Sequence, residues 1–349
     1  MNPALGGVAS SVSCLQEELL KLNVQSEIID SIDRANDLVN KSSAAIIAHG
    51  LWQWPGEVAL KRFKKSKAPY LVFPHGMLDP WFKKTYPFKH IKKQLYWWWK
   101  QREILKYAQA VCFTTEEERA LARKTFFPYQ ANEVVTGIGV SDPPQACLKQ
   151  KEQFLAKYSD LKDKRMLLYL GRFHPKKGVD LLIQEWKKKQ KDKKDITLVL
   201  GGPLSPSSPF IEKLKNLSYD CSNICWTGML EGKDKWTALR LADALILPSH
   251  QENFGMVVAE ACSVGKPVLL TNKVNLWREI ESTHAGMVAE DNAEGISEML
   301  SAWSEGRIQG AEKNALRCFQ DHLHVKNAAR RLIEVIQDAS PKSKRSSDC

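Results

Sequence analysis

The chain has 349 residues, which is long for a single hydrophobic core and predicts two domains of roughly 150 to 180 residues each. Its 43% hydrophobic and 26% charged residues are ordinary for a soluble globular protein, and no apolar run reaches the roughly eighteen residues of a membrane-spanning helix. The net charge of +11 favours acidic partners, namely nucleic acid, an anionic lipid surface or phosphorylated small molecules, without choosing among them. Because the first residues lack the basic start and apolar core of a signal peptide, we expect a cytoplasmic protein.

The eight cysteines are scattered along the chain without a CxxC pair or a His-rich companion. This pattern has neither the spacing of a zinc site nor that of a disulfide framework. We therefore expect reduced, mostly buried thiols at Cys14, Cys112, Cys147, Cys221, Cys225, Cys262, Cys318 and Cys349.

The first recognisable element is an amphipathic helical pattern that follows Gly6-Gly7 and runs to Leu22. A glycine pair that opens a helix usually follows a strand, and no strand pattern precedes this pair. The sequence therefore predicts that the first strand of the N-terminal sheet is missing or very short.

Short apolar runs then alternate with helical segments, at residues 44–48, 70–73, 110–113 and 133–135. Strands that alternate with helices predict a parallel α/β sheet, whose ligands bind at the carboxyl ends of the strands. His49 and His75 each follow a predicted strand, so we expect both at this ligand edge. For His75 a structural role and a functional role are equally compatible with the pattern.

A basic aromatic block begins at Trp81 and ends at Lys100, with Lys and Trp interleaved. Indole rings prefer the headgroup layer of a bilayer and lysines are attracted to anionic lipid, so the block suits a membrane interface or a lipid-linked acceptor. An equally good interpretation is a helix whose Trp face packs under the sheet while its lysines stay solvated. Nucleic-acid stacking is less favoured, because no known binding module accompanies the block.

The alternating pattern breaks between Ser141 and Tyr158, where Pro143-Pro144 precedes a short helical stretch. We interpret this segment as the domain boundary, and expect an N-terminal domain over residues 1–150 and a C-terminal domain over 151–325. The amphipathic pattern over residues 326–339 predicts a helix that packs back on the first domain. The polar, basic tail over residues 340–349 is expected to be disordered.

A second series of strands and helices begins with the predicted strand 166–170, which ends in the segment GRFHPKKG. Arg172 and Lys177 would project at this strand end, where two cations suit a diphosphate and stabilise its departing oxygens. Surface charge is the alternative interpretation, but the position at a strand end favours a binding site. Further strands are predicted at residues 196–200, 224–227, 242–247 and 267–271.

The stretch PSHQENFGMVVAEACSVGKP, residues 248–267, follows a buried strand and passes from a polar loop into a helix that begins near Phe254. Glu252 lies in the loop and Glu260 about two turns into the helix. Gly255 leaves the amides at the helix start uncovered, and such amides bind anions beside a carboxylate that accepts hydrogen bonds from hydroxyls. Phosphate and sugar are therefore expected to meet here. The alternative is that Glu252 caps the helix and Glu260 lies on a solvated face.

Taken in order, these pieces resemble the GT-B glycosyltransferases, and most closely the large retaining family numbered four. The stretch at residues 248–267 matches that family's E-x7-E signature, and GRFHPKKG matches its GR-x4-KG element. Supporting elements are Gly6-Gly7, His75-Gly76, Thr227-Gly228 and the segment after Gly286. The resemblance implies an α/β fold of two Rossmann-like, doubly wound domains that face each other across a cleft.

The resemblance also implies roles for individual residues. Arg172 and Lys177 would hold the donor diphosphate, Glu260 would bind the ribose hydroxyls, and Glu252 would lie beside the donor sugar. His75 would reach the sugar from the first domain. The catalytic candidates are Glu252, His75, Arg172 and Lys177. Further donor contacts are implied for Phe254, Gly255, Met256 and Val257 at the helix start, for Met229 and Leu230 beside the base, and for Gly7 near the phosphates.

We therefore expect transfer of a sugar from a nucleotide-diphosphate donor to an acceptor hydroxyl, with retention at the anomeric carbon. The family suggests a role in surface polysaccharide or glycolipid assembly, with a carbohydrate or lipid-linked acceptor and a peripheral contact with the inner face of the membrane through the block from Trp81 to Lys100. Two cationic side chains take the place of a divalent ion and no DxD element is well placed, so we expect no metal, no cofactor and no nucleic-acid partner.

Two other classes of protein share parts of this pattern. One is a non-catalytic nucleotide-sugar or glycan-binding subunit with a decayed N-terminal domain, which a missing first strand would suggest. The other is a dinucleotide oxidoreductase, which is disfavoured because Gly137-Ile138-Gly139 lacks the third glycine and the acidic residue of the dinucleotide fingerprint.

Overall fold

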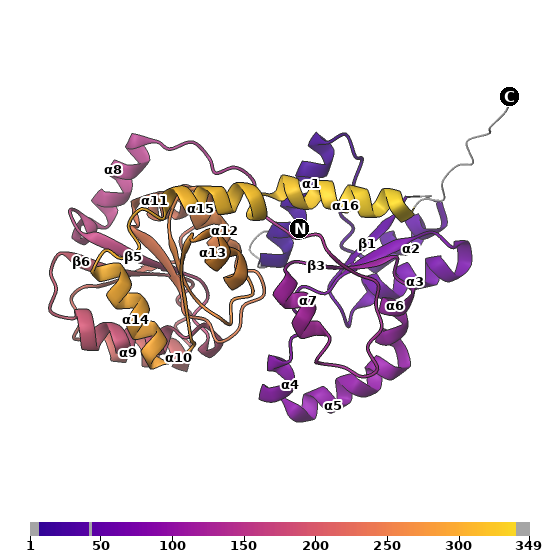
Figure 1. The fold of residues 1–349 in the computed structure, drawn as a ribbon, viewed down its shortest axis with the longest axis horizontal. Helices are drawn as coiled ribbons and strands as arrows, with labels where there is room; N and C mark the ends of the chain where they lie inside the picture. Colours follow the sequence, from indigo (N-terminus) through magenta and orange to yellow (C-terminus); the bar gives the residue numbers. More distant parts are fainter. Residues whose placement is uncertain (1–6, 42–43, 340–349) are drawn as a thin grey trace. The chain divides into compact units, whose positions relative to one another are not determined.

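The computed structural model describes residues 7–41 and 44–339, and divides the chain into two compact units (Figure 1). Unit 1 comprises residues 1–139 and 325–349, and unit 2 comprises residues 140–324. The sequence predicts a boundary near residue 150. The difference arises because helix α8 (Leu148–Lys157), which the sequence assigns to the linker, packs against α11 (Gly232–Leu241) within unit 2. Gly6 and the tail at residues 340–349 lie outside the described residues.

Unit 1 contains a parallel sheet of four strands in the order β1-β2-β3-β4. The strands are β1 (Ile46–His49), β2 (Tyr70–Phe73), β3 (Ala110–Phe113) and β4 (Glu133–Val135), close to the apolar runs of the sequence. Both β2 and β3 are buried along their whole length, as expected of strands covered on both faces. The first described element is α1 (Gly7–Lys21), and the prediction of a missing or very short first strand concerns residues that lie outside the described ones.

Helices pack on this sheet and share its core with the strands and loops. Trp97, Ile104 and Leu105 contribute to one buried cluster together with Val72 and Val111 of the strands. At the other end of the chain, α16 (Val325–Ala339) belongs to unit 1 and packs against α1 (Figure 1). The remaining helices of unit 1 are α2 (Ile32–Lys41), α3 (Trp54–Ser66), α4 (Trp81–Thr85), α5 (Pro87–Tyr96), the π-helix η2 (Trp97–Gln101), α6 (Arg102–Tyr107) and α7 (Glu116–Ala122).

The basic aromatic block forms α4, α5 and η2, and the structure divides its tryptophans between two environments. Trp97 is fully buried, stacks on Phe126 with ring centroids 4.9 Å apart, and donates its indole N–H to the carbonyl of Pro128 at 2.9 Å. Trp98 and Trp99 are 55% and 79% exposed. The packing interpretation therefore holds for Trp97, whereas the membrane interpretation stays a prediction for the exposed Trp98 and Trp99.

Unit 2 contains a parallel sheet of six strands in the order β10-β9-β8-β5-β6-β7. The chain first builds outward from β5 to β7, then returns to the other side of β5 and continues to β10. This is a doubly wound sheet whose strand order reverses between β5 and β8, the place where ligands bind in open α/β sheets. The strands are β5 (Arg165–Leu170), β6 (Ile196–Gly201), β7 (Ile224–Gly228), β8 (Ala244–Leu247), β9 (Val268–Thr271) and β10 (Gly286–Ala289).

Helices cover both faces of this sheet, and the two that matter most for the site are α11 and α12 (Met256–Ser263). The predicted helix at residues 179–186 continues to Gln190 as α9 (Val179–Gln190), with its lysines at the solvated end. The other helices of unit 2 are η3 (Ser159–Leu161), η4 (Pro175–Lys177), α10 (Pro209–Ser218), α13 (Trp277–Thr283), α14 (Ala293–Ser304), α15 (Glu312–Cys318) and η5 (Phe319–Leu323).

The described cysteines are all free thiols, which confirms the expectation of unpaired cysteines for this part of the chain. Four of them are buried, namely Cys112, Cys221, Cys262 and Cys318. Of the helices that the structure describes, none is both long and apolar enough to cross a membrane.

Candidate functional site

Two loops of unit 2 meet where the strand order reverses. The loop after β5 contains GRFHPKKG, and the loop after β8 leads to the start of α12. His250 donates its backbone N–H to the carbonyl of Lys176 at 2.8 Å, which joins the two loops directly. Gly178 makes this approach possible, because it adopts a left-handed φ of 65° and a Cβ there would lie 2.0 Å from the carbonyl oxygen of Pro248. The fold thus brings the two sequence motifs together.

Lys177 and Glu252 form an ion pair at this junction, although they are 75 residues apart in sequence. The side chain of Lys177 is 8% exposed and that of Glu252 is 23% exposed. The backbone of Glu252 is fixed by the loop after β9, since its N–H donates to Lys273 at 3.0 Å and its carbonyl accepts from Asn275 at 3.0 Å. A rigidly held carboxylate and a buried ammonium group therefore share one position at the strand ends.

The N-terminus of α12 lies beside this pair and has no side-chain cap. Its N-cap residue is Gly255, at a φ of 72°, which has no side chain to cap the first turn. The amides of Met256 and Val257 in the first turn are therefore available to an anion. The interpretation of Glu252 as the helix cap is wrong, because its Oε1 accepts from Asn253 and the helix begins only at Met256.

Glu260 is the second carboxylate of the site, and it is not on a solvated face as the alternative interpretation held. Its side chain is 13% exposed, and its Oε1 accepts a hydrogen bond from Lys235 Nζ of α11 at 2.6 Å. This ion pair leaves Oε2 for other hydrogen bonds. Sequence reasoning missed Lys235, because the lysine lies on an earlier helix and nothing in its spacing connects it with the E-x7-E signature.

Positive charge gathers in the loop after β5. Arg172 is exposed, and no carboxylate among the described residues pairs with it. Its carbonyl accepts a hydrogen bond from the buried Tyr169 hydroxyl at 2.9 Å, which fixes the backbone at the end of β5. Burial, together with the positive charges of Lys176 and its neighbours, lowers the pKa of His174 below its ordinary value. The loop therefore presents a positive potential to any ligand at the start of α12.

The remaining predicted donor contacts occupy different environments. Met229 is 56% exposed after β7, whereas the Leu230 side chain is buried and packs toward Gly201. Phe254 is also buried. Gly7 is exposed and begins α1 in unit 1. Among these four residues, exposed surface is found only at Met229 and Gly7.

In unit 1 the two predicted edge histidines contact each other. His49 Nδ1 and His75 Nε2 are 2.9 Å apart, and both rings stack with Phe73. Burial lowers the pKa of His49 to about 4, and burial together with His49 lowers the pKa of His75 well below its ordinary value. Both imidazoles are therefore neutral at pH 7, with one ring donating to the other.

The turn that carries His75 is held by a buried carboxylate. His75 has a left-handed φ of 51° and is followed by Gly76 at 74°. Glu118 Oε1 accepts from the Gly76 amide at 2.5 Å, and its Oε2 accepts from the amide and hydroxyl of Thr114 at 2.8 and 2.6 Å. Glu118, which the sequence did not single out, thus joins the ends of β2 and β3. Within the described residues no group of three or more potential metal ligands occurs.

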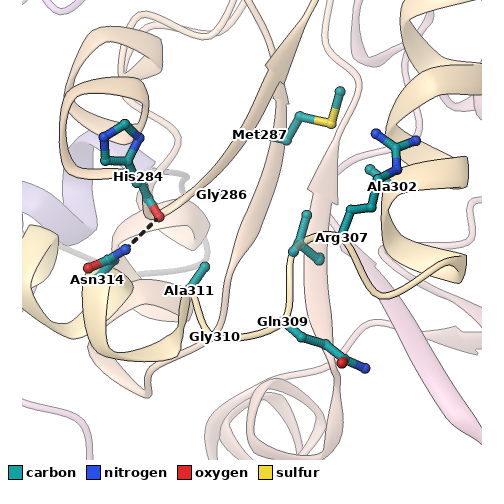
Figure 2. Close-up of a pocket in the computed structure, with 10 residues that line it drawn as sticks. His284, Gly286, Met287, Ala302, Arg307, Gln309, Gly310, Ala311 and Asn314 are labelled. Carbon is teal, nitrogen blue, oxygen red and sulfur yellow. Dashed lines mark hydrogen bonds between the residues drawn. The ribbon is translucent and has the colours of Figure 1, made fainter.

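A cavity of about 440 Å³ in unit 2 lies away from these loops (Figure 2). It is lined by Gly286 at the beginning of β10, whereas the candidate site lies at the carboxyl ends of the parallel strands. Asn314 donates to the carbonyl of His284 at 3.2 Å, and Figure 2 shows the side chains of His284, Arg307 and Gln309 pointing in different directions. Because a ligand pocket needs convergent polar groups, this cavity is not part of the candidate site.

Two family models match the chain, one in each unit. The model of glycosyl transferases group 1 matches residues 150–317, and that of the glycosyl transferase 4-like domain matches residues 32–137. The chain belongs to the glycosyl transferases of group 1. The family that the E-x7-E and GR-x4-KG elements predicted is therefore confirmed, and the first matched region contains both elements.

Curated relatives of this group 1 chain include several transferases. The alpha-D-kanosaminyltransferase of Streptomyces kanamyceticus is 24% identical over 54% of this chain and 49% of its own length. The O-antigen chain mannosyltransferase C of Escherichia coli is 26% identical over 60% of this chain and 59% of its own length. The mannosylfructose-phosphate synthase of Agrobacterium fabrum is 27% identical over 74% of this chain and 61% of its own length. The chain thus spans about half of the length of the curated relatives it matches.

Solved structures share the fold at low sequence identity. Anabaena HepE in complex with UDP and glucose has a TM-score of 0.69 and 14% identity, covering 92% of this chain and 88% of its own. Sucrose-phosphate synthase from Thermosynechococcus elongatus has a TM-score of 0.72 and 16% identity, covering 95% of this chain and 93% of its own. The predicted GT-B fold, with two Rossmann-like α/β domains, is therefore confirmed.

Proposed function

We propose that this protein transfers a sugar from a nucleotide-diphosphate donor to an acceptor hydroxyl, with retention at the anomeric carbon. The observation that carries the proposal is the junction between β5 and β8. An uncapped helix N-terminus, the cations Arg172 and Lys177, and the carboxylates Glu252 and Glu260 converge there from separate segments of unit 2. Such a combination suits a ligand that carries both a diphosphate and hydroxyl groups.

The donor would exchange partners with the ion pair at this junction. Its diphosphate would lie on the amides of Met256 and Val257 and take over Lys177, which is paired with Glu252 in the structure. Glu252, still fixed by its backbone, would then accept hydrogen bonds from the hydroxyls of the donor sugar. Glu260 would bind the ribose through the oxygen that Lys235 leaves open.

Stabilisation of the leaving diphosphate is the chemical step that these residues support. Negative charge grows on the diphosphate as the bond to the anomeric carbon breaks, and Arg172, Lys177 and the helix N-terminus are aimed at that charge. An oxocarbenium-like centre can then be attacked by the acceptor on the same face, which gives retention. Because two cations serve this purpose, the proposal includes independence from a divalent metal. His75, neutral at pH 7, is the proposed sugar contact of unit 1.

The acceptor in this proposal is a carbohydrate or a lipid-linked sugar. Support comes from the relatives, among which the mannosyltransferase C of Escherichia coli acts, by its name, on an O-antigen chain. We therefore place the protein in surface polysaccharide or glycolipid assembly, in the cytoplasm and in peripheral contact with the inner face of the membrane. The donor base and sugar are left to direct screening.

The alternative is a non-catalytic nucleotide-sugar or glycan-binding subunit. The observation that favours it is the contrast between the six-stranded, doubly wound sheet of unit 2 and the four consecutive strands that the described residues of unit 1 form. A protein that binds nucleotide through unit 2 but turns over no donor would fit this alternative.

The test begins with a panel of nucleotide sugars in a thermal-shift assay, since a ligand that binds the folded state raises its stability. The donor found in this way is then used for turnover, with the anomeric configuration of the product read by NMR. We expect Lys177→Met and Arg172→Met each to lower turnover by about a hundred-fold or more, as loss of one charge-stabilising group does elsewhere. Lys176→Met, which removes the adjacent charge, is the matched control. Equal turnover in all three variants would contradict the assignment of Arg172 and Lys177 to the diphosphate. Loss of turnover on addition of a metal chelator would contradict the proposed independence from a divalent metal.

A further inference from the structure

One surface of unit 1 is apolar, aromatic and basic, and no described element covers it. We call it the α5 face and define it by Phe88, Ile91, Leu95, Trp98, Trp99 and Phe127. Phe88, Trp99 and Phe127 are 82%, 79% and 78% exposed, and the other three are more than half exposed. Isolated exposed apolar residues are ordinary, but a contiguous group of large ones marks an interaction surface.

The continuous segment α5, η2 and α6 is buried on one side and exposed on the other. Its buried side comes from η2 and α6, because α5 itself has no buried residue. Trp97 of η2 and Ile104 of α6 belong to the core cluster of unit 1, and the buried Gln101 accepts a hydrogen bond from the Trp52 amide at 3.0 Å. The outer residues Phe88, Ile91, Leu95 and Trp99 follow one another at intervals of three or four, the spacing of a single helix face. A surface segment needs only its buried side to fold against its sheet, so the exposed apolar side serves another purpose.

Phe127 belongs to the same surface although it lies on a separate loop. Its carbonyl accepts hydrogen bonds from Gln94 and Trp98 at 2.6 Å each, and its N–H donates to Gln94 at 3.3 Å. The loop is therefore tied to α5, and these bonds present the Phe127 ring to solvent in a fixed place. An exposed phenylalanine held in this way is organised for contact with something outside the protein.

The charge around the α5 face has one sign. Between Trp81 and Arg102 the chain contains six lysines and one arginine but no aspartate or glutamate. Lys100 pairs with Glu57 at 2.5 Å and Lys93 lies over the Trp52 ring, so both serve the interior of unit 1. The other four lysines are exposed and form no ion pair with a described residue: Lys83, Lys84, Lys89 and Lys92.

We propose that the α5 face docks unit 1 on an anionic lipid bilayer, with the outer aromatic and aliphatic side chains inserted at headgroup depth and the four lysines over the lipid phosphates. Tryptophan prefers the membrane interface, and basic side chains beside an apolar helix face are attracted to anionic lipid. Lysine is depleted in protein–protein interfaces, where arginine is the common cation, so a protein partner fits this composition less well. A second copy of the chain would bring like charges together.

The inference deepens the membrane contact of the proposed function. Its test measures lipid binding alone, so it can fail while sugar transfer holds. Full-length protein is sedimented with vesicles of phosphatidylcholine, with or without phosphatidylglycerol, and tryptophan fluorescence is followed with brominated lipid as the quencher. We expect binding to the anionic vesicles, quenching of the exposed tryptophans, and release in about 1 M salt, where electrostatic screening acts within about 3 Å.

Variants separate the two contributions to binding. The triple change Phe88→Ser, Trp99→Ser, Phe127→Ser removes inserted apolar area and should weaken binding by about a hundred-fold or more. A lysine near an anionic surface contributes about five-fold in affinity, so Lys84→Glu with Lys92→Glu should weaken it by about 25-fold or more. The matched controls are exposed residues of unit 2, Leu148→Ser with Tyr219→Ser and Lys193→Glu with Lys194→Glu, which should leave binding unchanged.

Circular dichroism and the thermal transition of each variant confirm that it is folded. Absence of vesicle binding, equal binding to neutral and anionic vesicles, or equal losses in the control variants would overturn the proposal. The proposal would also be overturned if the triple variant still binds vesicles but no longer forms a dimer seen by light scattering, or no longer binds single-stranded RNA.

Discussion

Gly178 provides the most direct test of how unit 2 assembles its site. Its left-handed φ of 65° costs an alanine about 1 kcal/mol or somewhat more. The Cβ of Gly178→Ala would also lie 2.0 Å from the carbonyl oxygen of Pro248. Cβ atoms in proteins essentially never come closer than 3.0 Å to another heavy atom of this kind. The loops after β5 and β8 must therefore move apart by about 1 Å, a displacement that costs catalytic sites up to about a hundred-fold in rate.

The energetic cost follows from the same geometry. A movement of this size breaks the 2.8 Å hydrogen bond from the His250 amide to the Lys176 carbonyl, a further loss of about 1 kcal/mol. We expect Gly178→Ala to destabilise unit 2 by about 2–4 kcal/mol in total. Gly232→Ala is the matched control, because Gly232 has a φ of 50° and its Cβ would meet nothing within 4 Å. That variant should lose only the backbone term of about 1 kcal/mol.

Urea unfolding and nucleotide-sugar affinity of the two variants decide the question. The donor found by thermal shift should bind Gly178→Ala at least about ten-fold more weakly than Gly232→Ala, because only the first change separates Lys177 from the start of α12. Equal unfolding free energies and equal donor affinities in the two variants would refute the reasoning that this contact joins the two motifs.

Two further predictions concern the ion pair of Glu260 and the buried histidines. Glu260→Gln should abolish the preference for a nucleoside diphosphate over its 2′,3′-dideoxy form, a preference we expect at about ten-fold from the loss of charged hydrogen bonds. Lys235→Met should reduce this preference, and Lys235→Arg should retain it. Lys233→Met, on the same helix, is the control. If Lys235→Met leaves the preference unchanged, Lys235 has no role in ribose binding. Burial lowers the pKa of His49 to about 4 in the folded protein, whereas the ordinary pKa of histidine is 6.5. As the pH drops below 6.5, His49 therefore takes up a proton in the unfolded chain before it does so in the folded protein. The stability that the buried neutral ring allows is therefore complete above about pH 6.5 and lost progressively toward pH 4, and His49→Gln should reduce the loss of urea resistance between pH 7 and pH 5. Identical losses in His49→Gln and the parent protein would contradict that assignment.

The local patterns of the chain predicted every described strand except β10, and its motifs indicated the fold class and the family. Short apolar runs bounded by polar residues, proline or glycine located β2, β3, β5 and β8, because fully buried parallel strands are nearly continuous apolar segments. The helix start at Gly255 was also predictable, since a glycine after a polar loop and before small residues is a local signal. These features depend on neighbouring residues, which a single sequence displays directly.

Contacts between distant segments were not predictable in this way. Lys235 pairs with Glu260 because α11 and α12 pack side by side, and His49 meets His75 because β1 and β2 are neighbours in the sheet. The periodicity of the basic aromatic block does not say which of its apolar residues face the core. Only the packing of Trp97 on Phe126 settles that Trp98 and Trp99 face outward.

The sequence by itself determined that GRFHPKKG and PSHQENFGMVVAEACSVGKP each follow a strand and carry the charges of a donor site. The tertiary structure decided that they share one site, because the order of strands in unit 2 reverses between β5 and β8 and places their carboxyl ends side by side. Strand order is a property of the whole sheet, set by how all six strands and their helices pack. For that reason the meeting of Lys177 with Glu252 is visible only in the folded protein.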